Sequence, residues 1–502
     1  MSRWNLAWLL GICIASVGGL SLGFSAPSRD SALQKKHENL KLLVDVLEEV
    51  QGKYVKELDT DKMRDLVENM INSGLERLDP HSSFINPDEY KQFMKQSKGK
   101  FGGVGIRIGL DKNNQIFVES PMVGTPAYEA GVMAGDFILK IDGKSTESMS
   151  LKKVVEFIQG EPGTKVKMTV LHEGAKTPVD LEMERAEIHI DSVLGDRRAK
   201  DNVKDWDFWV DEQQKIAYVR VVAFTETTTQ ELTKVVADLQ KAGMKGLVLD
   251  LRNNPGGLLR SAVEVSSLFL PEGKNVVTTK GRNNMREEAF RARNEAPNVV
   301  PGSYPIAILL NRYSASASEI VAAALQDHFR AIIVGERSYG KGSVQNVISM
   351  ENGQSALKLT TASYWRPSSR NIHRFPDSKD EDEWGVKPTK GYEVKLTDEE
   401  RIEYFKHRRD RDIVRRPNQE PKDSGKKEYR DRVLDKAMEY VRENLNKKDN
   451  AGDPPANGGA ALTPRQPGVV RDVFPDQFQN PRSTLFGIGE PVPQGDAIRE
   501  DT

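Results

Sequence analysis

The sequence predicts a multidomain α+β protein, in which a helical N-terminal segment precedes a compact β-rich domain and a layered α/β core. Three observations support this. The 502 residues are enough for roughly three domains. Apolar residues recur at helical spacing near the N-terminus, form short strand-like runs from Phe101, and alternate between strands and helices over residues 216–365. Hydrophobic residues make up 37%, which excludes wholesale disorder and a polytopic membrane protein.

Charge and cysteine content exclude several functional classes. Lys and Arg number 73 against 74 Asp and Glu, so no global field favours nucleic acid or an anionic membrane surface. The one cysteine, Cys13, lies in an apolar N-terminal segment. This placement excludes a disulfide framework, a cysteine nucleophile and a thiolate zinc site in the folded part. The seven histidines include no HExxH pair, so no metal is expected.

Residues 1–26 are predicted to be a signal peptide or an N-terminal membrane anchor. No charged side chain occurs between Arg3 and Arg29, and Leu6 to Leu22 is as apolar as a secretory segment. Small residues permit cleavage before Ala26, whereas a retained segment is long enough to span a bilayer once. We therefore expect an exported protein of the periplasm or cell envelope, held at the inner membrane if the segment is retained.

The remaining chain divides by its patterns into five regions. They are an N-terminal helical region (30–98), the β-rich domain (99–187), the α/β core (188–400), a charged helical extension (401–446) whose surface is expected to be solvated, and a disordered tail (447–502). The motif "LDPHSSF" breaks the helical pattern of the first region, and we expect His81 in it to serve the turn rather than catalysis.

Two strand ends of the core carry groups suited to stabilising an anion. The motif "DLRNNPGG" follows an apolar strand, and Gly256 and Gly257 can expose backbone N–H groups to an oxyanion. The motif "RYSASASEI" places Ser316 at the positive end of a helix dipole. Two alternatives stay open here. Ser316 and Glu319 also fit a capping box, and Ser314 or Ser318 could be the nucleophile instead.

A lysine between two glycines supplies a candidate general base. Lys341 follows Ser316 by 25 residues, and it can act as a base only if burial keeps it neutral. The glycines on both sides permit close packing, and Gln345 can hold the amine toward the serine. Gly335 to Lys341 also fits G-x-x-x-x-G-K, but Gly342 stands where a phosphate loop needs Ser or Thr, so nucleotide binding is not expected.

The β-rich domain resembles a PDZ domain. The turn Gly103-Val104-Gly105-Ile106 opens a strand, and "AGVMAGDFILKIDGKS" follows, as in the carboxylate-binding loop and central hairpin of that family. Such a loop points backbone N–H groups at a peptide's C-terminal carboxylate, while the peptide adds a strand beside Ile106 and Ile108.

These motifs together, in this order, resemble the C-terminal processing (tail-specific) proteases, which are PDZ-containing Ser/Lys-dyad peptidases. The resemblance covers about residues 35–400 and implies a crotonase-like layered core with an inserted PDZ domain. It implies that Ser316 is the nucleophile, Lys341 the base and Gln345 an assisting residue. The oxyanion donors would be the N–H of Ala317 and that of Gly256 or Gly257. No cofactor is implied.

The resemblance also implies partners and leaves questions open. Expected partners are proteins or peptides with accessible, apolar C-termini, an adaptor protein, and the membrane through the N-terminal segment. Gln159 stands where many relatives carry a basic residue that couples peptide binding to activation, and the insertion 371–384 lies outside the match. Two competing hypotheses are a noncatalytic PDZ scaffold on a protease-like fold and an acyl-transfer enzyme acting on a thioester.

Overall fold

A computed structural model describes residues 29–97, 99–199, 202–284, 287–293, 300–414 and 429–451. The predicted leader (1–26) lies outside these ranges, as does the predicted disordered tail (447–502) from residue 452 onward. Residues 447–451 were expected to be disordered but form the end of a helix that begins at Arg432. The chain divides into two compact units, one ending at Gly74 and the other beginning at Leu75. Among the described helices, none combines the length and apolar character needed to cross a bilayer.

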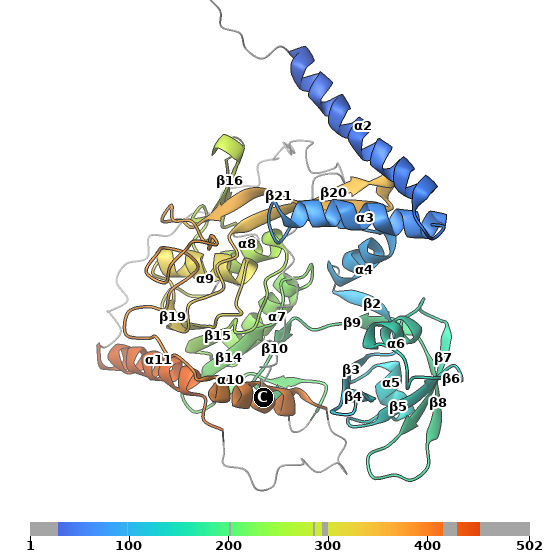
Figure 1. Ribbon diagram of the computed structural model, residues 1–502. Coiled ribbons are helices and arrows are strands. Elements are labelled where there is room, and N and C mark those ends of the chain that lie inside the picture. The colour runs from blue at the N-terminus through green and yellow to red at the C-terminus, as the bar shows by residue number, and fades with distance from the viewer. Residues whose placement is uncertain are drawn as a thin grey trace, which may run out of the picture. The chain divides into compact units, whose positions relative to one another are not determined.

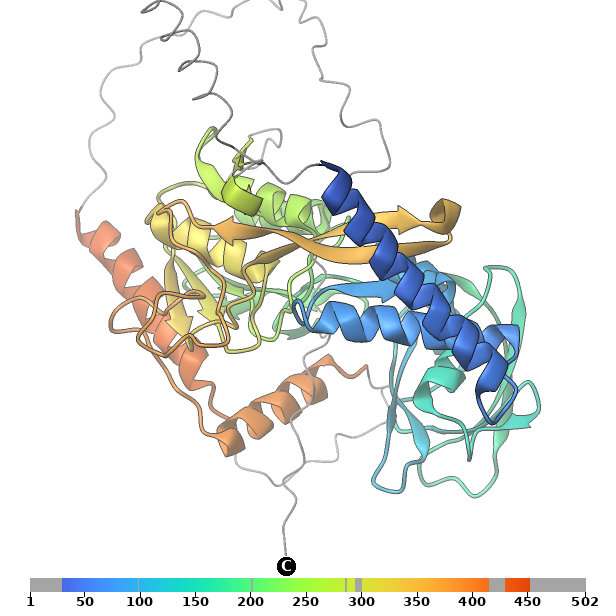
Figure 2. The same cartoon turned by 45° about the horizontal axis from the view of Figure 1, so that its top comes forward.

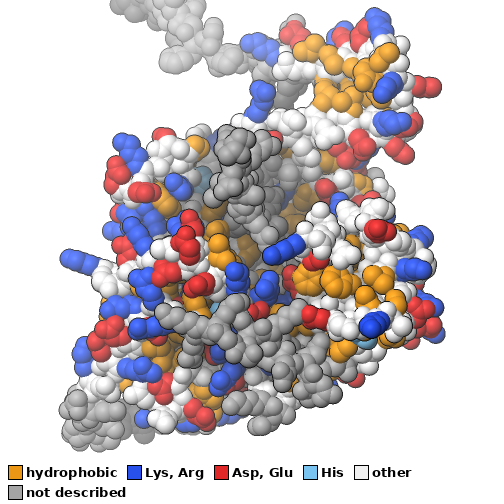
Figure 3. Space-filling view, turned by 60° about the horizontal axis from the view of Figure 1, so that its bottom comes forward, with side chains coloured by type: hydrophobic (Ala, Val, Ile, Leu, Met, Phe, Trp, Pro, Cys, Tyr) orange, Lys and Arg blue, Asp and Glu red, His pale blue; other side chains and the backbone are white. Residues whose placement is uncertain are grey.

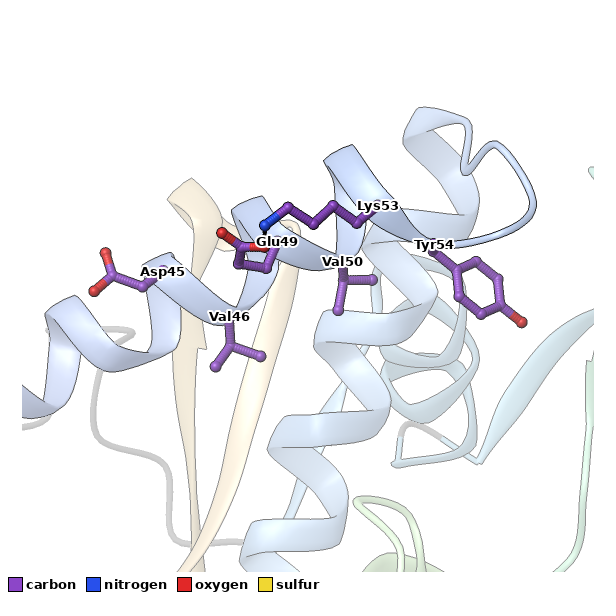
Figure 4. A pocket seen from close by; sticks show the side chains of 6 residues that line it. All are labelled: Asp45, Val46, Glu49, Val50, Lys53 and Tyr54. Atoms are coloured by element: carbon purple, nitrogen blue, oxygen red, sulfur yellow. Dashed lines mark ion pairs between the residues drawn. The ribbon is translucent and has the colours of Figure 1, made fainter.

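The first unit is helical, as its spacing of apolar residues predicts. Helix α2 (Arg29–Lys53) is followed by α3 (Thr60–Glu76), which runs on into the second unit. An open pocket on α2 is lined by Asp45, Val46, Glu49, Val50, Lys53 and Tyr54 (Figure 4). Its ion pair joins Lys53 to Glu49 across one helical turn, which is the ordinary pairing of an exposed helix face.

The second unit begins with β1 (Ser83–Ile85) and α4 (Pro87–Ser97) and continues into the β-rich domain. That domain holds β2 (Lys100–Gly103), β3 (Ile106–Leu110), β4 (Ile116–Pro121), α5 (Pro126–Ala130), β5 (Phe137–Ile141), β6 (Lys144–Ser145), α6 (Leu151–Ile158), β7 (Lys165–Leu171), β8 (Val179–Glu184) and β9 (Ala186–His189). Its antiparallel sheet has the order β3-β4-β5-β7-β8, with β6 beside β5. Because β2 pairs with β9, the chain enters and leaves the domain side by side, as an inserted domain requires.

A mainly parallel sheet forms the centre of the α/β core (Figure 1). Its strands are β10 (Val193–Leu194), β13 (Trp209–Asp211), β14 (Ile216–Val221), β15 (Gly246–Asp250), β18 (Ile306–Leu310) and β19 (Ile332–Gly335). Strands β14, β15, β18 and β19 run parallel, and β10 and β13 pair antiparallel with β14. These four parallel strands are almost wholly apolar because both faces of the sheet are covered.

Three helices cover one face of this sheet. They are α7 (Thr228–Lys241), α8 (Leu259–Ser267) and α9 (Ala317–Asp327). Ala217, Val219 and Val221 of β14 pack with these helices in one core cluster, whereas Ile216 and Tyr218 point to the opposite face. This alternation is the two-residue period of a strand.

The opposite face is covered by the C-terminal extension, which corrects the expectation of a solvated surface there. Helix α11 (Arg432–Ala451) buries Val433, Ala437, Met438 and Val441 against Ile216, Tyr218 and Val248 of the sheet. Figure 1 shows α11 and α9 on opposite sides of the strands. Exposing those strands to water would leave a large apolar surface, so the extension is part of the core.

Helix α10 (Asp398–Asp412) is also held to the core, by buried charges and by the buried ring of Tyr404. Arg220 of β14 pairs with Asp412 (2.6 Å), and Arg408 pairs with Asp196 (3.1 Å). Arg411 also pairs with Asp196. The charges of this region are therefore partly internal, because a buried arginine needs a carboxylate partner. On the face shown in Figure 3, acidic and basic side chains are interspersed and neither sign dominates.

A second, antiparallel sheet lies beside the first. It has the order β1-β21-β16-β17, with β20 paired to β21. Its remaining strands are β16 (Asn275–Gly281), β17 (Glu288–Arg291), β20 (Ser343–Met350) and β21 (Ser355–Trp365). The long ribbon of β20 and β21 is plain in Figure 2. Short strands β11 (Arg197–Arg198) and β12 (Trp206–Asp207) and the 3-10 turns η1 (Arg282–Asn284) and η2 (Glu351–Gly353) complete the described elements.

Candidate active site

The loop after β15, predicted to hold an oxyanion, is anchored by buried charges. Arg252 donates to Asp250 (2.7 Å) and to Asp431 of the C-terminal extension (2.9 Å). Burial raises the pKa of Asp250, but the charge and hydrogen bonds of Arg252 outweigh this effect, so the pKa lies below its ordinary value. These ion pairs hold the start of the loop in place, because separating the partners of a buried pair is strongly destabilising.

Asn254 holds the rest of this loop against the serine segment. Its Nδ2 donates to the carbonyl of Val221 (2.7 Å), and its Oδ1 accepts from the amide of Gly256 (2.8 Å). Its own carbonyl accepts from the amide of Ala315 (3.0 Å). Sequence reasoning did not identify Asn254, because its partners come from three separate segments.

The two glycines of the loop differ in what their amides do. The Gly256 amide donates to Asn254 Oδ1, whereas the amides of Gly257 and Ala317 donate to none of the described residues. Gly256 has φ 104°, and a Cβ there would lie 2.8 Å from the Cβ of Ser316. The glycine is therefore needed for close approach to Ser316, and of the two predicted loop donors Gly257 is the available one.

Ser316 stands at the start of α9 in a strained conformation. It is 1% exposed and has φ 53° and ψ −113°, a region that residues with a Cβ rarely adopt. Its Oγ is buried and makes no hydrogen bond within the described part of the chain. A buried hydroxyl normally makes a hydrogen bond. We therefore expect the Ser316 hydroxyl to interact with a group that the described residues do not provide.

The other two serines of the motif have structural partners. Ser314 Oγ donates to the carbonyl of Leu251 (2.8 Å), and Ser318 Oγ donates to the carbonyl of Asn254 (3.0 Å). Both hydroxyls donate to carbonyls of the loop after β15, and they hold the serine segment against that loop. This difference favours Ser316 over its two neighbours.

Glu319, which the sequence offered only as part of a capping box, joins the serine and lysine segments. Its Oε2 accepts from the amides of Ser316 and Lys341, both at 2.8 Å. Its Oε1 accepts from Ser338 Oγ (2.5 Å) and from the amide of Gly340 (2.7 Å). The carboxyl is fully buried, and burial raises its pKa to about 7 although these four donors favour the charged form. The two predicted catalytic segments thus share one oxygen atom.

Lys341 is buried at 6% exposure, as a lysine base requires. Its flanking glycines are needed for packing: a Cβ at Gly340 would lie 2.7 Å from the Cβ of Arg374, and one at Gly342 would lie 2.2 Å from the His373 nitrogen. Both contacts come from the insertion over 371–384. That segment therefore packs directly on the turn that carries Lys341.

Gln345 lies on β20 and is 1% exposed. Its Nε2 donates to Ser343 Oγ (2.9 Å) and to Thr360 Oγ1 (3.0 Å).

His81 lies near Lys341, and burial followed by the charge of Lys341 lowers the pKa of His81 to about 4. The turn that carries His81 is built by Asp79, whose carboxylate accepts from the His81 amide (2.8 Å).

The predicted peptide site has a free strand edge. Strand β3, with Ile106 and Ile108, ends the order of its sheet, and α6 lies beside it. Val104 is fully buried, and Gly105 has φ 78° in the turn before β3. The amide of Met122 donates to the Gly105 carbonyl (2.9 Å) and holds this turn, while the nearer acceptor of Thr125 Oγ1 is the Met122 carbonyl (2.7 Å). Gly103 pairs with Ala186, where β2 meets β9.

A serine at a helix start beside available backbone amides, a buried lysine and a sheet edge open to a peptide define the class of serine peptidases. Comparison with known proteins agrees. Residues 215–389 match the model of peptidase family S41, and residues 117–171 match a PDZ domain.

Two relatives extend the match over most of the chain. The "Carboxy-terminal-processing protease" of Bartonella bacilliformis is 40% identical over 387 residues, which are 76% of this chain and 83% of that protein. The "Carboxy-terminal processing protease CtpA" of Bacillus subtilis is 33% identical over 351 residues, 70% of this chain and 68% of that protein. The chain therefore belongs to peptidase family S41 and is a serine-type C-terminal processing peptidase with a PDZ domain, acting on protein or peptide substrates.

A solved structure, "Photosystem II D1 C-terminal processing protease", is also similar to the chain. It is 28% identical, with a TM-score of 0.38 over 69% of this chain and 85% of that one.

Proposed function

We propose that the peptidase reaction is carried by Ser316 as nucleophile and by Lys341, in its neutral form, as general base. Gln345 orients the lysine amine, and the amides of Gly257 and Ala317 form the oxyanion hole. The observation that carries this proposal is the buried hydroxyl of Ser316, which has no partner among the described residues while its neighbours Ser314 and Ser318 are bonded.

The steps follow from these roles. Lys341 Nζ takes the proton of Ser316 Oγ as the oxygen attacks the scissile carbonyl carbon. The carbonyl oxygen becomes negative and accepts from the amides of Gly257 and Ala317. When the C–N bond breaks, the leaving amine takes the proton from Lys341. A water molecule then attacks the acyl carbon while Lys341 takes its proton. When the ester C–O bond breaks, Ser316 Oγ takes that proton back and the new carboxyl terminus is released.

The test is degradation of an unfolded protein with an apolar C-terminus by the full chain and its variants. Ser316→Ala and Lys341→Ala should abolish cleavage while leaving the fold intact. Ser318→Ala and Ser314→Ala are the controls. The first loses one hydrogen bond to a backbone carbonyl, the second loses one to a carbonyl and one from the Asn311 amide, and both should still cleave. Cleavage by intact Ser316→Ala would reject the assignment. Binding of C-terminal peptides without hydrolysis by the wild type would favour the noncatalytic scaffold.

The PDZ domain is proposed to engage the substrate's C-terminus along the free edge of β3. Backbone amides around Gly103 to Gly105 would hold the carboxylate, and Ile106 and Ile108 would pair with the peptide backbone. A peptide that ends in an amide should therefore bind far more weakly than the same peptide with a free carboxylate. Equal affinities, measured by fluorescence anisotropy, would contradict this mode of binding.

Export to the periplasm or cell envelope is proposed on the uncharged segment between Arg3 and Arg29, which lies outside the described residues. Mass spectrometry of the mature protein separates cleavage before Ala26 from a retained anchor at the inner membrane. An adaptor protein is proposed as a further partner. Its test is co-purification with a partner that raises cleavage by the wild type.

A further inference from the structure

We propose that Asp79 and Thr360 are positioning residues that fix the orientation of the Gln345 side-chain amide. The inference rests on the proposed role of Gln345 beside Lys341. Through this chain of hydrogen bonds, a turn near residue 80 sets which end of the Gln345 amide faces the general base.

The three residues meet because the turn docks on the strand that also pairs with β20. Ser83 of β1 lies opposite Lys358 of β21, and Ser82 Oγ accepts from the amide of Thr360 (3.0 Å). Thr360 is in turn the partner of Gln345 in the β20–β21 register, next to a bulge. Figure 1 shows β20 and β21 running side by side. Strand pairing therefore places Gln345 beside Thr360, and the turn before β1 brings Asp79 to the same threonine.

Asp79 can only accept hydrogen bonds. Its carboxylate accepts from the amides of His81 (2.8 Å) and Ser82 (2.9 Å), from Ser82 Oγ (2.6 Å) and from Thr360 Oγ1 (3.0 Å). Burial raises the pKa of Asp79, but these donors outweigh it and leave the pKa below its ordinary value. The group is therefore a carboxylate at neutral pH.

The single hydroxyl hydrogen of Thr360 determines the orientation of the Gln345 side-chain amide. A threonine hydroxyl has one hydrogen, and that hydrogen is donated to Asp79. Thr360 Oγ1 must therefore accept from Gln345, which selects the Nε2 end of the amide (3.0 Å). Ser343 Oγ accepts from the same nitrogen (2.9 Å). Both Nε2 hydrogens are occupied, and the carbonyl oxygen is left as the group that Gln345 presents to Lys341.

The reversed amide would oppose the proposed chemistry. A neutral lysine has one lone pair, and this pair must take the proton of Ser316. An N–H of Gln345 turned toward Lys341 would donate to that lone pair and withhold it from the serine. A carbonyl oxygen accepts from the amine instead and leaves the lone pair free. Orientation of the amide should thus change the rate of the chemical step and not the binding of substrate.

The test uses Thr360→Val in the full chain, which removes the hydroxyl but keeps the shape of the side chain. We expect kcat to fall about tenfold, the factor for one ordinary hydrogen bond, with KM and the melting temperature nearly unchanged. Thr360→Ser, which restores the hydroxyl, should recover most of the loss. Thr278→Val is the matched control: it lies on β16 of the same sheet, its hydroxyl accepts from Asn275, and kcat should be unaffected.

A double-mutant cycle sharpens the result. If Thr360 acts through Gln345, Thr360→Val should have no further effect on kcat in a Gln345→Ala background. An equal loss in both backgrounds, or wild-type kcat in Thr360→Val, overturns the inference. Those outcomes leave the proposed function intact as long as Ser316→Ala is inactive. Activity in Ser316→Ala would reject the proposed function itself.

Discussion

The buried carboxyl of Glu319 should give the protein a distinct pH dependence of stability. Burial raises its pKa from 4.5 to about 7, while the unfolded chain keeps an ordinary value. Between these pH values the folded state holds a proton that the unfolded state has released. The stability contributed by this group is therefore complete below pH 4.5 and is lost as the pH rises through 7.

The size of the effect follows from the shift. One pKa unit corresponds to about 1.4 kcal/mol, so wild type should lose about 3 kcal/mol relative to Glu319→Gln between pH 4.5 and pH 7.5. For a core of roughly 200 residues this amounts to a change of about 6 to 12 °C in the difference between their melting temperatures.

The assay is thermal unfolding of the full chain, followed by circular dichroism at several pH values, for wild type and Glu319→Gln. Glu264→Gln is the control, because Glu264 lies on the surface of α8 and pairs with Arg260. A difference between wild type and Glu319→Gln that stays constant from pH 4.5 to 7.5 would refute a raised pKa. In that case the four donors, rather than burial, would determine the charge of Glu319.

Three further predictions concern the surroundings of the site. Asp431→Ala leaves the buried Arg252 with one partner fewer and should cost about 3 kcal/mol, seen as a lower melting temperature; an unchanged temperature would mean that the pair is not buried. Gly256→Ala places a Cβ 2.8 Å from that of Ser316 and should reduce cleavage at least about tenfold in the degradation assay, with full activity as the contradicting result. Val441→Asp puts a charge between α11 and the sheet and should prevent stable folding, whereas soluble, active enzyme would argue against that packing.

Local patterns predicted much of the fold and the centre of the site. The spacing of apolar residues predicted helices near the N-terminus and an alternation of strands and helices over residues 216–365, and the structure has both. The glycines around Lys341 were expected to permit close packing, and the structure packs Arg374 and His373 against them. These features depend on neighbours within a few residues, so a single sequence contains them.

Contacts between distant segments could not be predicted in the same way. Arg252 and Asp431 are 179 residues apart, and nothing in the charged extension indicates which of its acidic residues turns inward. The arginines of these ion pairs could have been recognised from the sequence. Arg220 and Arg252 lie in or directly after wholly buried strands, where an arginine requires a carboxylate partner. The roles of Asp79 and Thr360 likewise arise only when β1 and β20 both pair with β21.

The packing of α11 on the central sheet affects the order of events during synthesis. Arg252 leaves the ribosome long before Asp431, and at about 5 to 20 residues per second the intervening 179 residues take roughly 10 to 35 s to translate. During that time one face of the sheet has no cover and the oxyanion loop lacks its distal anchor. The nascent chain therefore completes the proposed oxyanion loop only after translation has nearly ended, and we expect the peptidase to stay inactive until then.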